Sequence, residues 1–158
     1  MSSKNRIGPK ITLDGEADFK KAIADVNNSL RLLRSEAKKN TRDFALNKNE
    51  LGFCTSQYST LSRTMAEQRD KIRIIQAALE TATQKFGANS EAVREWQIKL
   101  NYAKADLAET AKKVDDLGES WDKLEKEAGP KGVLEHMADG LNDVRDKIDK
   151  FKDKINIF

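Results

Sequence analysis

The sequence predicts an all-α protein: an elongated antiparallel helical hairpin or coiled coil with a short extended N-terminus and a C-terminal helix. Apolar residues recur at alternating steps of three and four from Leu51 to Phe86 and again from Val93 to Ala128, which places one apolar seam along one face of a helix. The composition, 38% hydrophobic and 35% charged, suits long helices with a narrow apolar stripe. Disorder is the competing interpretation of such polarity, and the unbroken periodicity argues against it.

The N-terminal residues 1–14 are expected to be extended. Gly8-Pro9 interrupts helical structure, and Ile11 and Leu13 alternate with polar neighbours, as in a short strand. A first helix is expected over residues 15–46, because apolar side chains return to the three-four spacing there.

Asn40 interrupts the apolar stripe of this first helix, whereas Leu32 widens the stripe. A lone Asn at a seam position can fix the register of two helices at some cost in stability. The alternative is that the helix frays at Asn40. We favour fraying, since Asn47 and Asn49 also indicate a break.

The long hairpin is expected over residues 49–128, with its turn near residues 87–90. Gly87 suits the left-handed conformation that ends a helix, Ser90 can cap the next helix, and Glu91 suits its positive end. Each arm of roughly 36 residues would be about 54 Å long. A C-terminal amphipathic helix is expected over residues 133–156, after the stop signal Gly129-Pro130.

The seam of the hairpin is expected to consist of large side chains from both arms. These are Leu61, Met65, Ile72, Ile75, Leu79, Phe86, Val93, Trp96, Leu100, Leu107, Val114 and Leu117. Gln68 and Thr110 are polar steps in these ladders and stand at the same height on opposite arms. We therefore predict a buried hydrogen bond between their side chains. Ile74, Ile98 and Tyr102 lie off the seam and could receive the first helix or a partner.

The sequence contains no pattern typical of an enzyme. His136 is the only histidine, and zinc needs three or four ligands of suitable spacing. Cys54 lies on the apolar ladder, where a free cysteine behaves as a small hydrophobe. We therefore expect no catalytic residue, metal, cofactor or small-molecule substrate. A single cysteine also fits a reducing compartment.

The charge pattern argues against a nucleic-acid partner. The net charge of +3 comes from 29 basic and 26 acidic residues, interleaved as on a solvated helix face. The first helix carries a modest basic cluster that is less concentrated than phosphate binding requires. Its members are Arg31, Arg34, Lys38, Lys39 and Arg42. The chain has no apolar run long enough to predict a membrane span.

Several short sequence motifs are recognisable between residues 7 and 117. They are Ile7-Gly8-Pro9-Lys10-Ile11, Leu13-Asp14-Gly15-Glu16, Phe19-Lys20-Lys21-Ala22-Ile23, Leu30 to Glu36, Gln68 to Leu79, Glu95-Trp96-Gln97, Leu100-Asn101 and Ala105-Asp106-Leu107. On these motifs the chain resembles the opening of tape-measure proteins from the tails of tailed phages and prophages. The resemblance covers about residues 7–117, and its opening is the distinctive part.

The resemblance implies a non-enzymatic structural protein that templates the assembly and length of a tail tube. Its expected partners are tail-tube and tail-assembly proteins, with self-association through coiled coils, and its expected locations are the virion tail and, during assembly, the host cytoplasm. Members of this family are usually several times longer and carry apolar stretches that this chain lacks. We therefore expect an N-terminal part, a remnant from a degenerate prophage or a short relative.

Two other classes compete with this interpretation. A generic coiled-coil adaptor of the chromosome-partition or cytoskeletal type would share the helices without the Ile-Gly-Pro-Lys-Ile opening. A nucleic-acid-binding helical protein would show salt-dependent binding.

Overall fold

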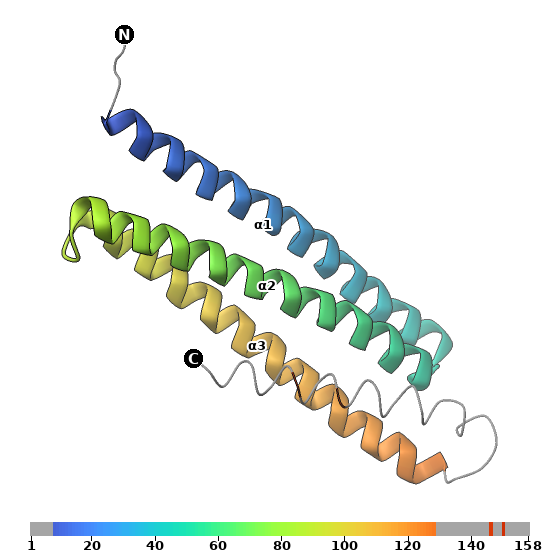
Figure 1. Cartoon of the computed structure of the whole chain (residues 1–158). Helices are drawn as coiled ribbons and strands as arrows, with labels where there is room; N and C mark the ends of the chain where they lie inside the picture. The colour runs from blue at the N-terminus through green and yellow to red at the C-terminus, as the bar shows by residue number, and fades with distance from the viewer. Residues whose placement is uncertain (1–7, 129–145, 147–149, 151–158) are drawn as a thin grey trace. The chain divides into compact units, whose positions relative to one another are not determined.

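The computed structural model describes residues 8–128, together with residues 146 and 150. Three long helices account for nearly all of the range 8–128: α1 (Gly8–Asn47), α2 (Glu50–Phe86) and α3 (Glu91–Ala128), of 40, 37 and 38 residues (Figure 1). That range contains no strand. The all-α prediction and the helical hairpin are therefore confirmed. The predicted C-terminal helix over 133–156, and His136 within it, lie outside the described residues apart from Asp146 and Lys150.

The N-terminus differs from the prediction, because α1 begins at Gly8 and residues 8–14 are helical rather than extended. The physical reason is the position of Pro9 in the first turn. The first backbone N–H groups of a helix have no intrahelical acceptor, so the N–H that proline lacks costs no hydrogen bond there. The same dipeptide that would break a helix interior is compatible with its start.

The chain forms two compact units, and each draws on all three helices. The described part of the first unit comprises residues 8–31 and 66–107, and that of the second comprises residues 32–65 and 108–128 with 146 and 150. The buried apolar side chains of the first unit are Val26, Ile72, Ile75, Ala78, Ala82, Trp96, Leu100, Ala103 and Leu107. Those of the second unit are Leu33, Cys54, Tyr58, Leu61, Met65, Val114, Leu117 and Trp121.

The connection between α2 and α3 has the chemistry that the sequence predicted. Gly87 has a φ of 86°, and its N–H donates to the Thr83 carbonyl at 2.9 Å. Ser90 caps α3, because its Oγ accepts a hydrogen bond from the Val93 N–H at 3.2 Å. The turn reverses the chain within the first unit, so α2 and α3 run antiparallel there.

The connection between α1 and α2 is shorter and is built from asparagines. Lys48 adopts a left-handed conformation with a φ of 57°, and its N–H donates to the Phe44 carbonyl at 2.8 Å. Asn49 caps α2 by accepting the Gly52 N–H at 3.0 Å, while its own N–H donates to the Asn47 side chain at 2.8 Å. These local hydrogen bonds end α1 and start α2 with two residues between them.

The predicted seam residues are buried with three exceptions. Leu79 and Val93 are half-buried, and Phe86 is 53% exposed because it is the last residue of α2. Leu32, expected to widen the stripe of the first helix, is 62% exposed. Conversely, Thr60 and Ala78 are buried although the three-four ladder passes beside them.

Candidate functional site

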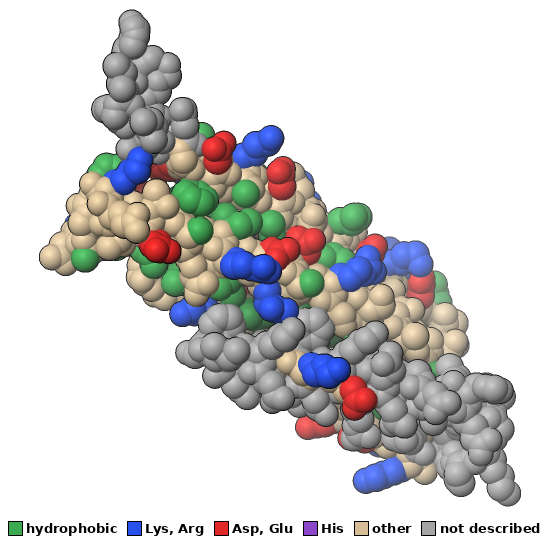
Figure 2. Space-filling view, in the orientation of Figure 1, with side chains coloured by type: hydrophobic (Ala, Val, Ile, Leu, Met, Phe, Trp, Pro, Cys, Tyr) green, Lys and Arg blue, Asp and Glu red, His purple; other side chains and the backbone are tan. Residues whose placement is uncertain are grey.

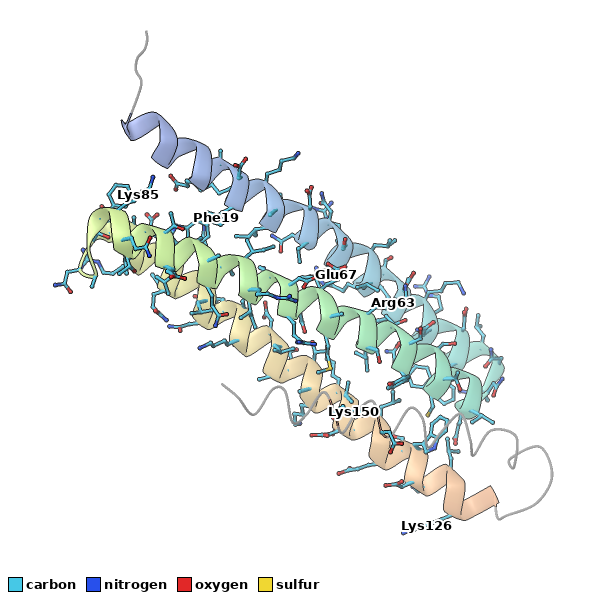
Figure 3. All side chains as sticks on the ribbon, in the orientation of Figure 1. Phe19, Arg63, Glu67, Lys85, Lys126 and Lys150 are labelled. Carbon is cyan, nitrogen blue, oxygen red and sulfur yellow. The ribbon has the colours of Figure 1, made fainter. Side chains whose placement is uncertain are left out.

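Phe19, Trp96 and Lys99 form a small aromatic contact in the first unit. The rings of Phe19 on α1 and Trp96 on α3 meet edge to face, with centroids 6.4 Å apart. The Lys99 ammonium lies 4.4 Å from the centroid of the Trp96 ring. Figure 3 labels Phe19 on the ribbon of α1. Through this contact α1 meets α3 with large side chains, and the three residues include no nucleophile.

A polar network joins α1 and α2 in the second unit. The Asn40 side-chain amide donates to Gln57 Oε1 at 2.9 Å and to Thr60 Oγ1 at 3.1 Å. The Thr60 hydroxyl in turn donates to the Ser56 carbonyl at 3.1 Å. The interpretation that the first helix frays at Asn40 is therefore wrong. The alternative, in which Asn40 fixes the register of two helices, agrees with this geometry.

Gln68 is the polar residue of the seam in the first unit. Its Nε2 donates to the backbone carbonyl of Asp106 at 3.4 Å, and its Oε1 is buried without a hydrogen-bond partner. The predicted acceptor was the side chain of Thr110, which is itself buried. The structure thus gives Gln68 a backbone acceptor one turn before Thr110. A side-chain amide that keeps one polar atom unsatisfied costs stability in an apolar seam.

A cleft of about 380 Å³ opens in the second unit beside Cys54. It is lined by Phe44, Glu50, Phe53, Cys54, Ser120, Lys123 and Leu124. The rings of Phe44 and Phe53 lie 5.0 Å apart between centroids on one side of it. Among the described residues, this lining combines apolar rings with the carboxylate of Glu50 and the ammonium of Lys123.

The chemistry of Cys54 argues against a nucleophile. The thiol is 2% exposed, and burial, with a smaller contribution from the negative charge of Glu50, raises its pKa above the ordinary value. A thiol with a raised pKa stays protonated at neutral pH and reacts poorly. Among the described residues, no group of three or more His, Cys, Asp or Glu side chains is placed to hold a metal ion.

The charged side chains of the surface are interspersed, as Figure 2 shows for one face. On α1, Arg34, Lys38 and Arg42 are exposed. The nearby carboxylates have other partners: Glu36 pairs with Arg63 of α2 at 2.7 Å, and Asp43 pairs with Lys39 at 2.6 Å. The hydrogen bond and charge of Asp43 raise the pKa of Lys39. Such exposed pairs contribute little to stability.

Two large apolar side chains stand on the outer face of α3 in the first unit. Ile98 is 55% exposed and Tyr102 is 71% exposed, one helical turn apart. The sequence analysis predicted that either the first helix or a partner protein could pack on this face. The exposure shows that α1 does not cover it, whereas Ile74 on α2 is half-buried.

None of the three helices carries a stretch that is apolar enough, over a sufficient length, to cross a bilayer, as far as the described part of the chain extends. No family model, curated protein or solved structure matches this chain. The candidate functional features are therefore the helices themselves and the polar contacts that set their alignment.

Proposed function

We propose that this chain is a non-enzymatic structural protein of a phage tail, the N-terminal part of a tape measure that templates tail-tube assembly and length. The observation that supports the proposal most is the length of the helices, 40, 37 and 38 residues, each with an apolar face. The resemblance of the opening from Ile7 to Ile23 to tape-measure proteins supports this specific role for the long helices.

Helix length is the property that a molecular ruler needs. Each helical residue adds about 1.5 Å, so the chain from Gly8 to Ala128 would reach roughly 180 Å as one continuous helix. The expected partners are tail-tube and tail-assembly proteins, and the expected locations are the assembling tail in the host cytoplasm and the finished virion tail. Self-association would use the same apolar seams.

The test is a change in helix length that keeps the seam in phase. An insertion of about 14 residues, or two heptads, into the part of the gene that encodes α3 keeps the apolar face aligned and adds about 21 Å of helix. If the chain runs through the tail as one continuous helix, electron micrographs of tail particles should then show tails that are longer by the same increment. The matched control is Glu109→Gln, an exposed substitution on the same helix that leaves its length unchanged.

Two results would reject this function. The first is the absence of the chain from purified tails, and the second is an unchanged tail length when the inserted protein is incorporated. Recovery of the chain with a partition or cytoskeletal complex instead would favour the adaptor alternative.

A further inference from the structure

The connection between α1 and α2 holds a residue in a costly backbone conformation. Lys48 has a φ of 57°, in the left-handed region that residues with a side chain adopt at a penalty. Its counterpart at the other connection is Gly87, which adopts a φ of 86° without that penalty. Lys48 and Asn49 alone separate α1 from α2. If Lys48 returned to the right-handed region and the capping residue Asn49 became helical too, one helix would run on into the other.

Residues 15–47 of α1 supply fewer fully buried side chains to the two cores than α2 or α3 does. Of the buried apolar side chains whose burial is described, Val26 and Leu33 belong to α1, and all the others belong to α2 and α3. Apolar burial is the dominant favourable term that holds helices together. The free energy that keeps α1 in place is therefore smaller than the free energy that keeps α2 and α3 paired.

The other described contacts of α1 with its neighbours are two ring pairs, Phe19 with Trp96 and Phe44 with Phe53, and several polar contacts. In the second unit the polar contacts are the Asn40 amide on Gln57 and Thr60 and the ion pair of Glu36 with Arg63, of which Figure 3 labels Arg63. When a helix moves away, water replaces such partners at a small net cost. By contrast, most of the buried apolar side chains in each unit belong to α2 and α3, which also share the contact of Gln68 with the Asp106 carbonyl.

We propose that α1 is a detachable arm that swings away about Lys48 and joins α2 as one continuous helix, while α2 and α3 stay paired. Opening would uncover the Trp96 ring that Phe19 now meets, and the continuous helix from Gly8 to Phe86 would be about 120 Å long. The proposal does not depend on a role in phage tails, because an adaptor with this sequence would open in the same way.

Substitutions at Lys48 test the arm in the intact chain by hydrogen exchange. A helix that has lost its tertiary packing is only marginally stable in water, so α1 would fray in the open form and its amides would exchange. Partial opening therefore predicts that amides of residues 15–47 exchange faster than amides in the middle of α2 and α3. Lys48→Gly should slow this α1 exchange roughly tenfold, because glycine adopts the left-handed conformation freely and disfavours the helix interior of the open form. Lys48→Ala is the matched control, and it should not slow exchange, because alanine retains the left-handed penalty and favours a helix.

A distance measurement distinguishes a continuous helix from an unfolded arm. Spin labels at Lys38 and Ser59, on exposed positions of the second unit, would be separated by about 32 Å of axis in a continuous helix, whereas packed helix axes lie about 10 Å apart. The measurement uses a Cys54→Ala background with Asn40→Ala and Lys48→Ala, which weaken the arm and favour opening. A population near the longer separation is expected, and Lys48→Gly in place of Lys48→Ala should reduce it.

Three results would overturn the proposal. In the first, α1 exchanges at the same rate as α2 and α3. In the second, Lys48→Gly and Lys48→Ala change the α1 exchange equally. In the third, the weakened variant shows either no released population or a broad range of distances, which would mean that α1 stays closed or unfolds rather than extending α2.

Discussion

Asn40 shows how a single polar side chain can align two helices. Its amide hydrogens reach two acceptors on α2, and both would be lost if α1 slid by one turn. The sequence showed the Asn at a seam position but not the acceptors, because Gln57 and Thr60 look like ordinary surface residues in a linear reading. The same applies to Thr60 and Ala78, which are buried because α2 contacts both α1 and α3 and so needs a wider buried face than one ladder describes.

Removal of this network should reveal a coupling energy. Asn40→Ala is expected to lower the free energy of unfolding by about 1–2 kcal/mol, since part-buried hydrogen bonds contribute roughly 0.5–1.5 kcal/mol each. A double-mutant cycle with Gln57→Ala, measured by urea unfolding, should give a coupling of about 0.5 kcal/mol or more. Lys38→Ala on the exposed face is the control. Additive effects of the two network substitutions would show that Asn40 and Gln57 do not act together.

Gly52 is a second residue whose role depends on its neighbour. A Cβ at this position would lie 2.7 Å from the Asn49 Nδ2, so alanine would displace the side chain that caps α2. Gly52→Ala is therefore expected to destabilise the chain by about 1 kcal/mol, although alanine favours a helix.

The control for Gly52 is Gly118 in the interior of α3. A Cβ there meets nothing within 4 Å, so Gly118→Ala should stabilise the chain by about 0.5–1 kcal/mol. Thermal unfolding of both variants measures the contrast. A stabilising Gly52→Ala would mean that the Asn49 cap does not constrain this position.

The thiol of Cys54 links stability to pH. Burial raises its pKa above the ordinary value of 9.0, so the folded chain holds this proton more tightly than the unfolded chain does. This contribution to stability is fully present below the ordinary pKa and is lost as the pH rises through the raised value. Urea unfolding should show the free energy of unfolding falling above the ordinary pKa of 9.0 by more in the wild type than in Cys54→Ala. Equal slopes for the two proteins would contradict the burial of the thiol.

At the scale of elements, the turns were the most predictable feature, because their chemistry is local. Gly87 and Ser90 act as the sequence indicated, through a positive φ and an N-cap. The start of α1 was not predictable in the same way, since Gly8-Pro9 is compatible both with a helix start and with an extended segment. Phe86 follows the seam spacing but lies at the end of α2, where periodicity does not report burial.

The two turn residues should each be costly to replace. Gly87→Ala is expected to destabilise the hairpin by about 1–2 kcal/mol, because alanine pays for the left-handed conformation. Ser90→Ala should cost about 0.5–2 kcal/mol through the lost cap. Ser90→Asp, which preserves a capping oxygen, is the control in thermal unfolding. A stable Gly87→Ala protein would indicate that the chain does not turn at this residue.

At the scale of the whole molecule, the sequence predicted three long helices in the range 8–128 and the places in the sequence where the chain turns between them. It did not predict the division into two compact units. Periodicity reports which face of a helix is apolar, and it carries no information about which partner covers that face. Phe19, Val26 and Leu33 follow the same spacing as the seam residues of α2 and α3, so the smaller number of fully buried side chains on α1 could be seen only in the structure.

The most direct test of the account measures the fold-back of α2 on α3. Spin labels at Gln76 and Asn101, exposed positions of the first unit equally distant from the turn, are joined by a helix axis of about 38 Å if the chain is straight. The hairpin predicts helix axes about 10 Å apart and a correspondingly short distance between labels, in a Cys54→Ala background and at high dilution. A distance near the straight-helix value at every concentration would contradict the antiparallel pairing on which the account rests.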